Sequence, residues 1–213
     1  MGEDAPHILV LGIGNLLWAD EGWGVRVAEA LHQRFEFPGN VRVMDGGTQG
    51  LYLVHHICDA DVLLVFDAID YGLPPGTLKI VEGEAVPRFM GAKKMSLHQT
   101  GFQEVISTAE LLGKCPAHMM LIGVQPVELE DFGGSLRDEP KEKMDEAIRL
   151  GLDFLSRFNI LARPREGIAE PISSTETALD IYEAERPAED VAFRRGDMRF
   201  INRTTDGGTS SCA

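Results

Sequence analysis

Two carboxylates and one imidazole stand where the chain can gather ligands for a metal ion. Glu21 lies beyond the first strand-like run, Asp67 ends the third such run, and His98 lies in a long loop. Two oxygens and one nitrogen form an incomplete shell with open positions, which suits a divalent first-row metal. The three residues are 46 and 31 positions apart, so spacing alone is weak support. The alternatives are a first-turn acid favoured by the helix dipole, a turn acid and a solvated loop histidine.

A fourth acid, Asp45, precedes two glycines at the end of the second strand-like run. Asp-Gly-Gly is typical of a plain turn, and this interpretation stays open beside a functional one. Other catalytic patterns are missing, because the chain contains no GxSxG elbow, HExxH helix or Walker lysine. Cys58 is expected within a helix and Cys115 just after one, so neither resembles an activated nucleophile.

The glycine-rich segment Gly12-Ile-Gly-Asn15 raises a nucleotide-binding alternative. Gly12 and Gly14 match the first two glycines of GxGxxG, but Leu17 stands at the third position. The acid expected about 20 residues further on does not end a strand. The next helix also starts too late for its N-terminus to bind a pyrophosphate. A nucleotide-binding regulator therefore remains only as a minor alternative.

These residues depend on an alternation of strands and helices. Apolar runs predict strands over 7–13, 41–44, 61–66, 76–81 and 118–124, and periodic patterns predict helices over 22–35, 48–58, 102–112 and 140–155. A loop of about twenty residues is expected after the fourth strand. This order predicts an α/β fold, a mostly parallel twisted sheet of about five strands with helices on both faces. Such a sheet gathers its functional residues at the carboxyl ends of its strands.

The composition of the chain indicates a domain followed by a tail, and it argues against some classes of partner. Residues 1–159 are expected to form a single α/β domain, and 160–213, rich in Pro, Ser and Thr, a flexible tail of low order. A formal charge of −14 argues against nucleic acid and anionic membranes as partners. No apolar run is long enough to cross a membrane, and the acidic N-terminus does not resemble a signal peptide. Three scattered cysteines predict no disulfide framework, so we expect a cytoplasmic protein.

Four ordered segments, ILVLGIGNLLWADEGWGVRVAEAL, VMDGGTQG, LLVFDAID and SLHQTG, resemble the signatures of the nickel-iron hydrogenase maturation proteases. The resemblance covers roughly residues 7–157. It implies a twisted parallel α/β fold and an endopeptidase that clips a C-terminal extension from the hydrogenase large-subunit precursor after nickel insertion. It further implies that Glu21, Asp67 and His98 recognise the metal, and that Asp45 has a role in activity.

We therefore expect an aspartyl-type processing endopeptidase whose partner is this precursor. Nickel is expected to arrive within the precursor, as a substrate-borne ion rather than a cofactor held permanently. It can polarise the scissile carbonyl or activate water, with Asp45 as general base or water-orienting group. A non-catalytic nickel-binding chaperone of the precursor, using the same three residues, is the rival interpretation.

Overall fold

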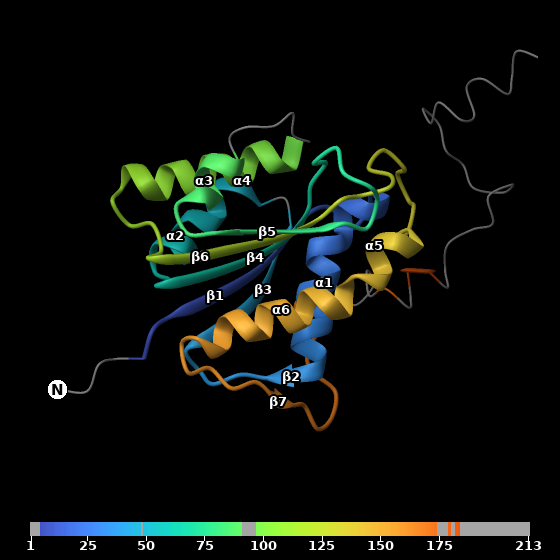
Figure 1. Ribbon diagram of the computed structural model, residues 1–213. Helices are drawn as coiled ribbons and strands as arrows, with labels where there is room; N and C mark the ends of the chain where they lie inside the picture. The colour runs from blue at the N-terminus through green and yellow to red at the C-terminus, as the bar shows by residue number, and fades with distance from the viewer. Residues whose placement is uncertain (1–4, 48, 91–96, 174–178, 180–181, 184–213) are drawn as a thin grey trace, which may run out of the picture.

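A five-stranded, mostly parallel sheet forms the centre of the molecule (Figure 1). The computed structural model describes residues 5–47, 49–90, 97–173, 179 and 182–183. The strand order is β3-β1-β4-β6-β5, in which β5 alone runs antiparallel to its neighbour. The strands are β1 (Ile8–Ile13), β3 (Val41–Gly47), β4 (Val62–Ala68), β5 (Leu78–Glu82) and β6 (His118–Val124). The α/β fold and the mostly parallel sheet expected from the sequence are confirmed.

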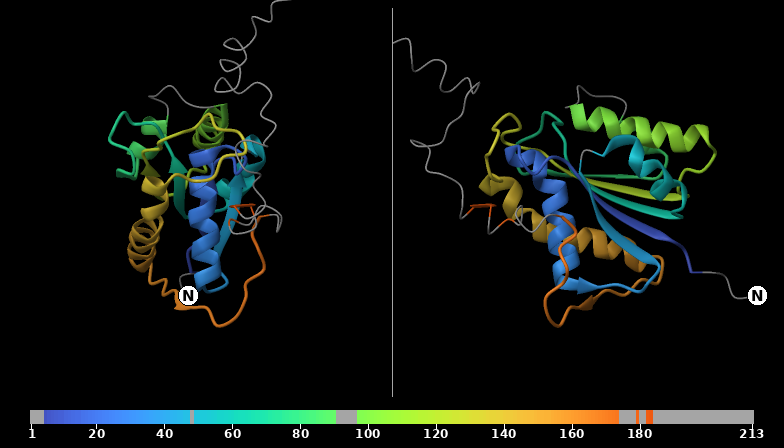
Figure 2. Two further views of the ribbon diagram at one scale, coloured as in Figure 1. Left: turned by 90° about the vertical axis from the view of Figure 1, so that its right-hand side faces the viewer. Right: turned by 180° about the vertical axis from the view of Figure 1, so that it is seen from behind.

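Helices cover both faces of this sheet (Figures 1 and 2). One face packs against α1 (Trp23–Arg34) and α6 (Met144–Ser156), which follows the short α5 (Asp138–Glu142). The other face packs against α2 (Val54–Cys58), α3 (Ala85–Met90) and α4 (Leu97–Leu111). Short 3-10 turns, η1 (Ala19–Gly22) and η2 (Gly50–Leu53), lead into α1 and α2. Within the described residues, no helix has the length and apolar character to span a membrane.

Side chains that alternate along each strand fill two separate cores. In β4, Leu64 and Phe66 pack toward α1 and α6, whereas Leu63 and Val65 pack toward α2 and α4. Because successive side chains of a strand point to opposite faces, a strand buried on both faces is apolar throughout. This explains why the sequence shows continuous apolar runs.

Glycines allow the start of α1 to approach the ends of β1 and β4 closely. A Cβ on Gly24 would lie 2.2 Å from the carbonyl oxygen of Phe66, and one on Gly14 only 1.8 Å from that of Glu21. Gly14 also has φ +133°, a conformation that favours glycine. Backbone packing therefore explains these glycines without a bound nucleotide.

The prediction of a long loop after the fourth strand is wrong. Helix α3 occupies part of it, and α4 begins at Leu97, so that His98 lies in a helix rather than a loop. The physical reason is burial: Val86 of α3 is fully buried against the same core as Phe102 of α4. The helix expected over 140–155 is also divided, into α5 and α6.

Contacts with the domain continue beyond the boundary predicted at residue 160. Strand β7 (Arg163–Pro164) pairs with β2 (Phe35–Glu36), directly after α1. The Arg165 side chain then donates hydrogen bonds to the carbonyl oxygens of His32 (3.1 Å) and Phe35 (3.1 Å). Residues 174–178, 180–181 and 184–213 lie outside the described residues, so the low order of the tail as a whole stays a prediction.

Replacing Arg165 by Ala is expected to lower stability. The change removes two hydrogen bonds from a cation to the last carbonyls of α1, a loss of about 1–2 kcal/mol. The melting temperature should then fall by about 2–4 °C for each kcal/mol lost. Thermal unfolding followed by circular dichroism measures this. Arg163→Ala, with an exposed side chain in the same ribbon, is the control and should melt like the wild type; equal melting of both variants would contradict the prediction.

Candidate active site

Glu21 and Asp67 come together at the carboxyl edge of the sheet. Glu21 lies in η1, after β1, and is 8% exposed, whereas Asp67 lies near the end of β4 and is 1% exposed. Burial raises the pKa of Asp67 well above its usual range, and the negative charge of Glu21 raises it further. The Ala68 backbone N–H opposes this shift. Two carboxyl groups thus share a buried site in which each disfavours ionisation of the other.

One oxygen of this pair has no partner in the described part of the chain. Asp67 Oδ2 is buried there without a hydrogen bond from any described residue. A buried carboxylate oxygen left without a donor costs free energy, so such atoms commonly mark a functional site. A cation bound here would supply the missing interaction.

Tyr71, which the sequence reasoning missed, places a phenol beside Asp67. Asp67 pairs with Gly123 of β6, and a Cβ on Gly123 would lie 1.9 Å from the Tyr71 hydroxyl. Burial, and then the charge of Asp67, raise the pKa of Tyr71, so the phenol stays protonated and can donate a hydrogen bond. The side chain of Gln125 holds this loop by accepting from the backbone N–H of Tyr71 at 2.7 Å. A glycine within an apolar strand is a signal of such close approach.

His98 lies in the first turn of α4. Its backbone is described, but its side chain lies outside the described residues. Helix α4 packs on the sheet face that Asp67 shares with Val65, through Phe102 and Val105. The helix begins above the carboxyl edge of the sheet (Figure 1). The backbone of His98 therefore lies at the same edge and on the same face of the sheet as Asp67.

Asp45 is not brought together with these residues. It pairs in register with Gly12, and Gly12 pairs with Phe66, so the strand β1 separates Asp45 from Asp67. Its neighbour Met44 packs on the α2–α4 side. By alternation, Asp45 faces the α1 side, opposite to Asp67.

A polar cluster surrounds Asp45 on that side. Burial raises the pKa of Asp45, while the Gly47 backbone N–H and the Arg26 guanidinium lower it. Arg26 is itself buried and forms a 3.0 Å ion pair with Glu29. The C-terminal segment reaches this cluster: Ser173 hydrogen-bonds Glu29, and Tyr182 lies with its ring 5.8 Å from Arg26. Asp45 is therefore half-buried in a separate polar cluster, which contains the charged side chains of Arg26 and Glu29.

The family model described as hydrogenase maturation protease matches residues 25–154. This chain belongs to the hydrogenase maturation protease family. Hydrogenase expression/formation protein HupM of Azotobacter chroococcum mcd 1 is 59% identical over 201 residues, 94% of this chain and 96% of the relative. The hydrogenase 2 maturation protease of Escherichia coli K12 is 39% identical and covers 76% of this chain and 98% of its own length.

Solved structures agree with this membership. The hydrogenase maturating endopeptidase HybD from E. coli has a TM-score of 0.71 and 38% sequence identity, and covers 75% of this chain and 98% of its own. A solution structure of an endopeptidase from Escherichia coli gives the same TM-score with 37% identity. The chain is thus a hydrogenase maturation endopeptidase, a hydrolase of peptide bonds.

The described side chains of this maturation protease include a buried pair of carboxylates but no complete set of metal ligands. No group of three or more His, Cys, Asp or Glu side chains among them is arranged to hold a metal ion. Glu21 and Asp67 provide two carboxylate groups, and His98, the predicted third ligand, has no described side chain. The carboxylate pair fits a divalent cation because a positive charge offsets both burial and mutual repulsion.

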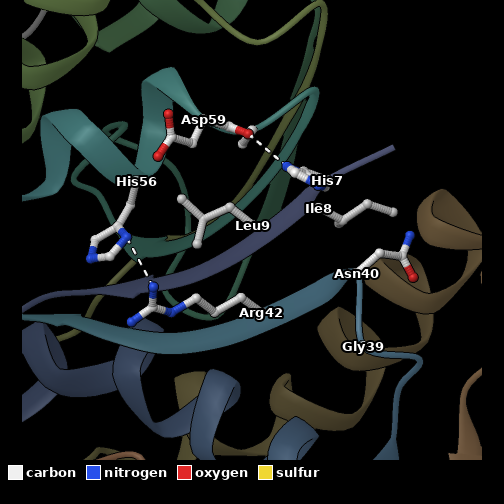
Figure 3. A pocket seen from close by; sticks show the side chains of 9 residues that line it. His7, Ile8, Leu9, Gly39, Asn40, Arg42, His56 and Asp59 are labelled. Atoms are coloured by element: carbon white, nitrogen blue, oxygen red, sulfur yellow. Dashed lines mark hydrogen bonds between the residues drawn. The ribbon is translucent and has the colours of Figure 1, made fainter. Parts of the chain in front are cut away.

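Two cavities in the described part of the protease lie elsewhere. One, of about 380 Å³, is at the amino ends of β1 and β3, where Figure 3 shows Arg42 beside His56, and His7 beside Asp59. The other, of about 510 Å³, runs along α1 and is lined by residues that include Arg26 and Lys141. Neither is lined by Glu21 or Asp67, so both cavities are separate from the carboxylate pair.

Asp67→Asn is expected to stabilise the free protein at neutral pH. A raised pKa means that the folded state binds the proton more tightly than the unfolded chain, so this carboxyl group's contribution to stability falls as pH rises above about 4 toward the raised folded value. Asparagine removes the cost of ionisation. If that cost is about 1 kcal/mol, the melting temperature at pH 7 rises by about 2–4 °C.

Thermal melts at pH 7 and near pH 4 test this sign. The advantage of Asp67→Asn should shrink in acid, where the wild-type carboxyl is also neutral. Asp153→Asn, at an exposed position on α6, should follow the wild type at both pH values. A variant less stable than the wild type at pH 7 would mean that Asp67 is not an electrostatic burden in the free protein.

Proposed function

We propose that this protease removes the C-terminal extension of a nickel-iron hydrogenase large-subunit precursor after nickel insertion, and that it recognises the bound nickel through Glu21, Asp67 and His98. The observation that carries the proposal is the buried carboxylate pair at the carboxyl edge, with Asp67 Oδ2 lacking a described donor. Family membership supports the hydrolytic activity. The same membership gives no support to the rival, a non-catalytic nickel-binding chaperone.

The carboxylate pair supplies the selectivity in this proposal. Without a cation, Glu21 and Asp67 repel each other in a buried site. A precursor that carries nickel brings the charge that relieves this repulsion, whereas a precursor without nickel does not. Docking is therefore favourable only for the loaded substrate, and the protease acts as a checkpoint. A cytoplasmic location and a substrate-borne metal belong to the same proposal.

The positions of Asp67 and Asp45 separate docking from cleavage. Two strand spacings, about 10 Å, divide their backbones, and their side chains face opposite sides of the sheet. If Asp45 acts on the scissile bond, at least about three residues of extended chain separate this bond from the nickel-binding point of the precursor. Asp45 then accepts a proton from the attacking water, whose oxygen bonds to the scissile carbonyl carbon, and it returns this proton to the amide nitrogen as the C–N bond breaks, so that the extension leaves with a free amine.

Glu21→Gln and His98→Ala are expected to abolish processing without unfolding the protein. Glutamine keeps the shape of Glu21 but removes the charge that a cation needs, and alanine removes the nitrogen donor. Pull-down of the nickel-loaded precursor should fail with both variants, and its gel mobility should not change. Glu130→Gln, an exposed acid in the loop after β6, is the control and should process normally. Normal processing by either site variant would refute nickel docking at these residues.

Asp45→Asn is expected to separate binding from cleavage. An amide is a poor base, so turnover should fall by about 10²–10⁴-fold. Binding of the loaded precursor should stay near that of the wild type, because Asp45 lies away from the carboxylate pair. A pull-down beside a single-turnover processing assay measures both. Full activity would leave Asp45 as a turn residue before Gly46 and Gly47, since asparagine is well suited to turns.

A further inference from the structure

Asp20, the residue before Glu21, is a fully buried carboxylate engaged entirely by backbone. Its Oδ2 accepts hydrogen bonds from the N–H groups of Val127 (2.8 Å) and Glu128 (2.9 Å), and its Oδ1 accepts one from Arg137 (2.7 Å). The donors are 107 to 117 residues away along the chain. One side chain thus joins the turn after β1 to the loop after β6.

Backbone contacts reinforce the same connection. The N–H of Ala19 donates to the carbonyl of Asp131, and that of Asp20 donates to the carbonyl of Glu128, each at 3.1 Å. The loop that receives them is closed by a 2.7 Å ion pair between Arg137 and Asp131, whose side chain is 1% exposed. Hydrogen bonds from residues 127–137 therefore hold the turn that carries Glu21.

The turn needs these hydrogen bonds because its backbone is strained. Ala19 has φ +27°, in the region that residues with a Cβ rarely adopt. Such a conformation costs free energy and persists only where the surroundings impose it. Strain of this kind is commonly found at functional sites, where it orients a reacting group.

We propose that Asp20 is a positioning residue that holds the carboxylate of Glu21 beside Asp67. The inference rests on the proposed recognition of nickel by Glu21. A carboxylate is required because three N–H donors converge on it and a carboxylate only accepts. Asparagine would direct an NH₂ group at one or two of those donors, which releases the turn from the loop. Glu21 then loses its fixed place next to Asp67.

Titration of the free protein with Ni²⁺ by calorimetry tests the proposal. Loss of a residue that orients a metal ligand typically weakens metal affinity by about 10–100-fold, and we expect this for Asp20→Asn. Glu130→Gln is the control, an exposed acid of the same loop, and it should bind Ni²⁺ like the wild type. Asp20→Asn that folds and keeps wild-type affinity overturns the proposal.

A double variant distinguishes positioning from a general loss of stability. If Asp20 acts through Glu21, Asp20→Asn should weaken Ni²⁺ binding little further once Glu21→Gln is present. Effects that multiply would show that Asp20 supports the fold as a whole, and would overturn the inference.

Should Asp20→Asn not fold, Arg137→Pro removes a single donor to Asp20 at a residue whose φ of −75° suits proline. Arg137→Ala loses the same ion pair to Asp131 but keeps that donor, so the proline variant should lose more affinity; equal affinities would overturn the proposal.

Amide hydrogen exchange separates this proposal from the proposed function. The N–H of Glu21 donates to the carbonyl of Trp18 at 2.8 Å, and Asp20→Asn should make it exchange faster. If Glu21→Gln leaves Ni²⁺ affinity unchanged, nickel recognition fails, yet faster exchange in Asp20→Asn still supports positioning of the turn. Unchanged exchange would show that Asp20 does not hold it.

Discussion

The burial of two neighbouring carboxyl groups, Glu21 and Asp67, is the constraint on which the rest of this site depends. Each is removed from water, and each makes the other harder to ionise. Without constraints on the turn, the Glu21 side chain would rotate into solvent. The fold prevents this through the close approach at Gly14, the strained Ala19 and the three hydrogen bonds to Asp20.

This arrangement links stability to function. A protein that buries like charges is less stable than it would be with a neutral pair, and sites that bind charged ligands commonly carry this cost. A divalent cation reverses the balance because its charge turns repulsion into attraction. The free protease is thus prepared for a positive partner, and the proposed discrimination between loaded and unloaded precursor follows from electrostatics alone.

The fold was largely predictable because strands buried on both faces are continuous apolar runs. The same property hid the geometry of the site. Since β4 is apolar up to Asp67, and the alternation of Val41, Arg42 and Val43 in β3 ends at Met44, the sequence does not reveal which faces Asp45 and Asp67 occupy, and the structure places them on opposite faces. The helical start of α4 was missed because residues 82–101 carry no strong period.

The residues that position the site were also beyond sequence reasoning. Asp20 stood unnoticed beside Glu21 because its partners are more than a hundred residues away. Tyr71 was missed for a similar reason, although Gly123 in an apolar strand was a usable signal of close approach. Long-range contacts of this kind have no local pattern, whereas candidate ligands such as Glu21 and Asp67 can be selected from their residue types and their positions near the ends of strand-like runs.

Incubation of the purified protein with precursor that carries nickel, and with the same precursor without nickel, tests the central claim most directly. Mass spectrometry of the large subunit reports whether the C-terminal extension has been removed. The account predicts loss of mass from the loaded precursor alone, because only that substrate neutralises Glu21 and Asp67. Equal cleavage of both precursors would contradict recognition of nickel by the carboxylate pair, and binding of the loaded precursor without any loss of mass would instead favour the chaperone.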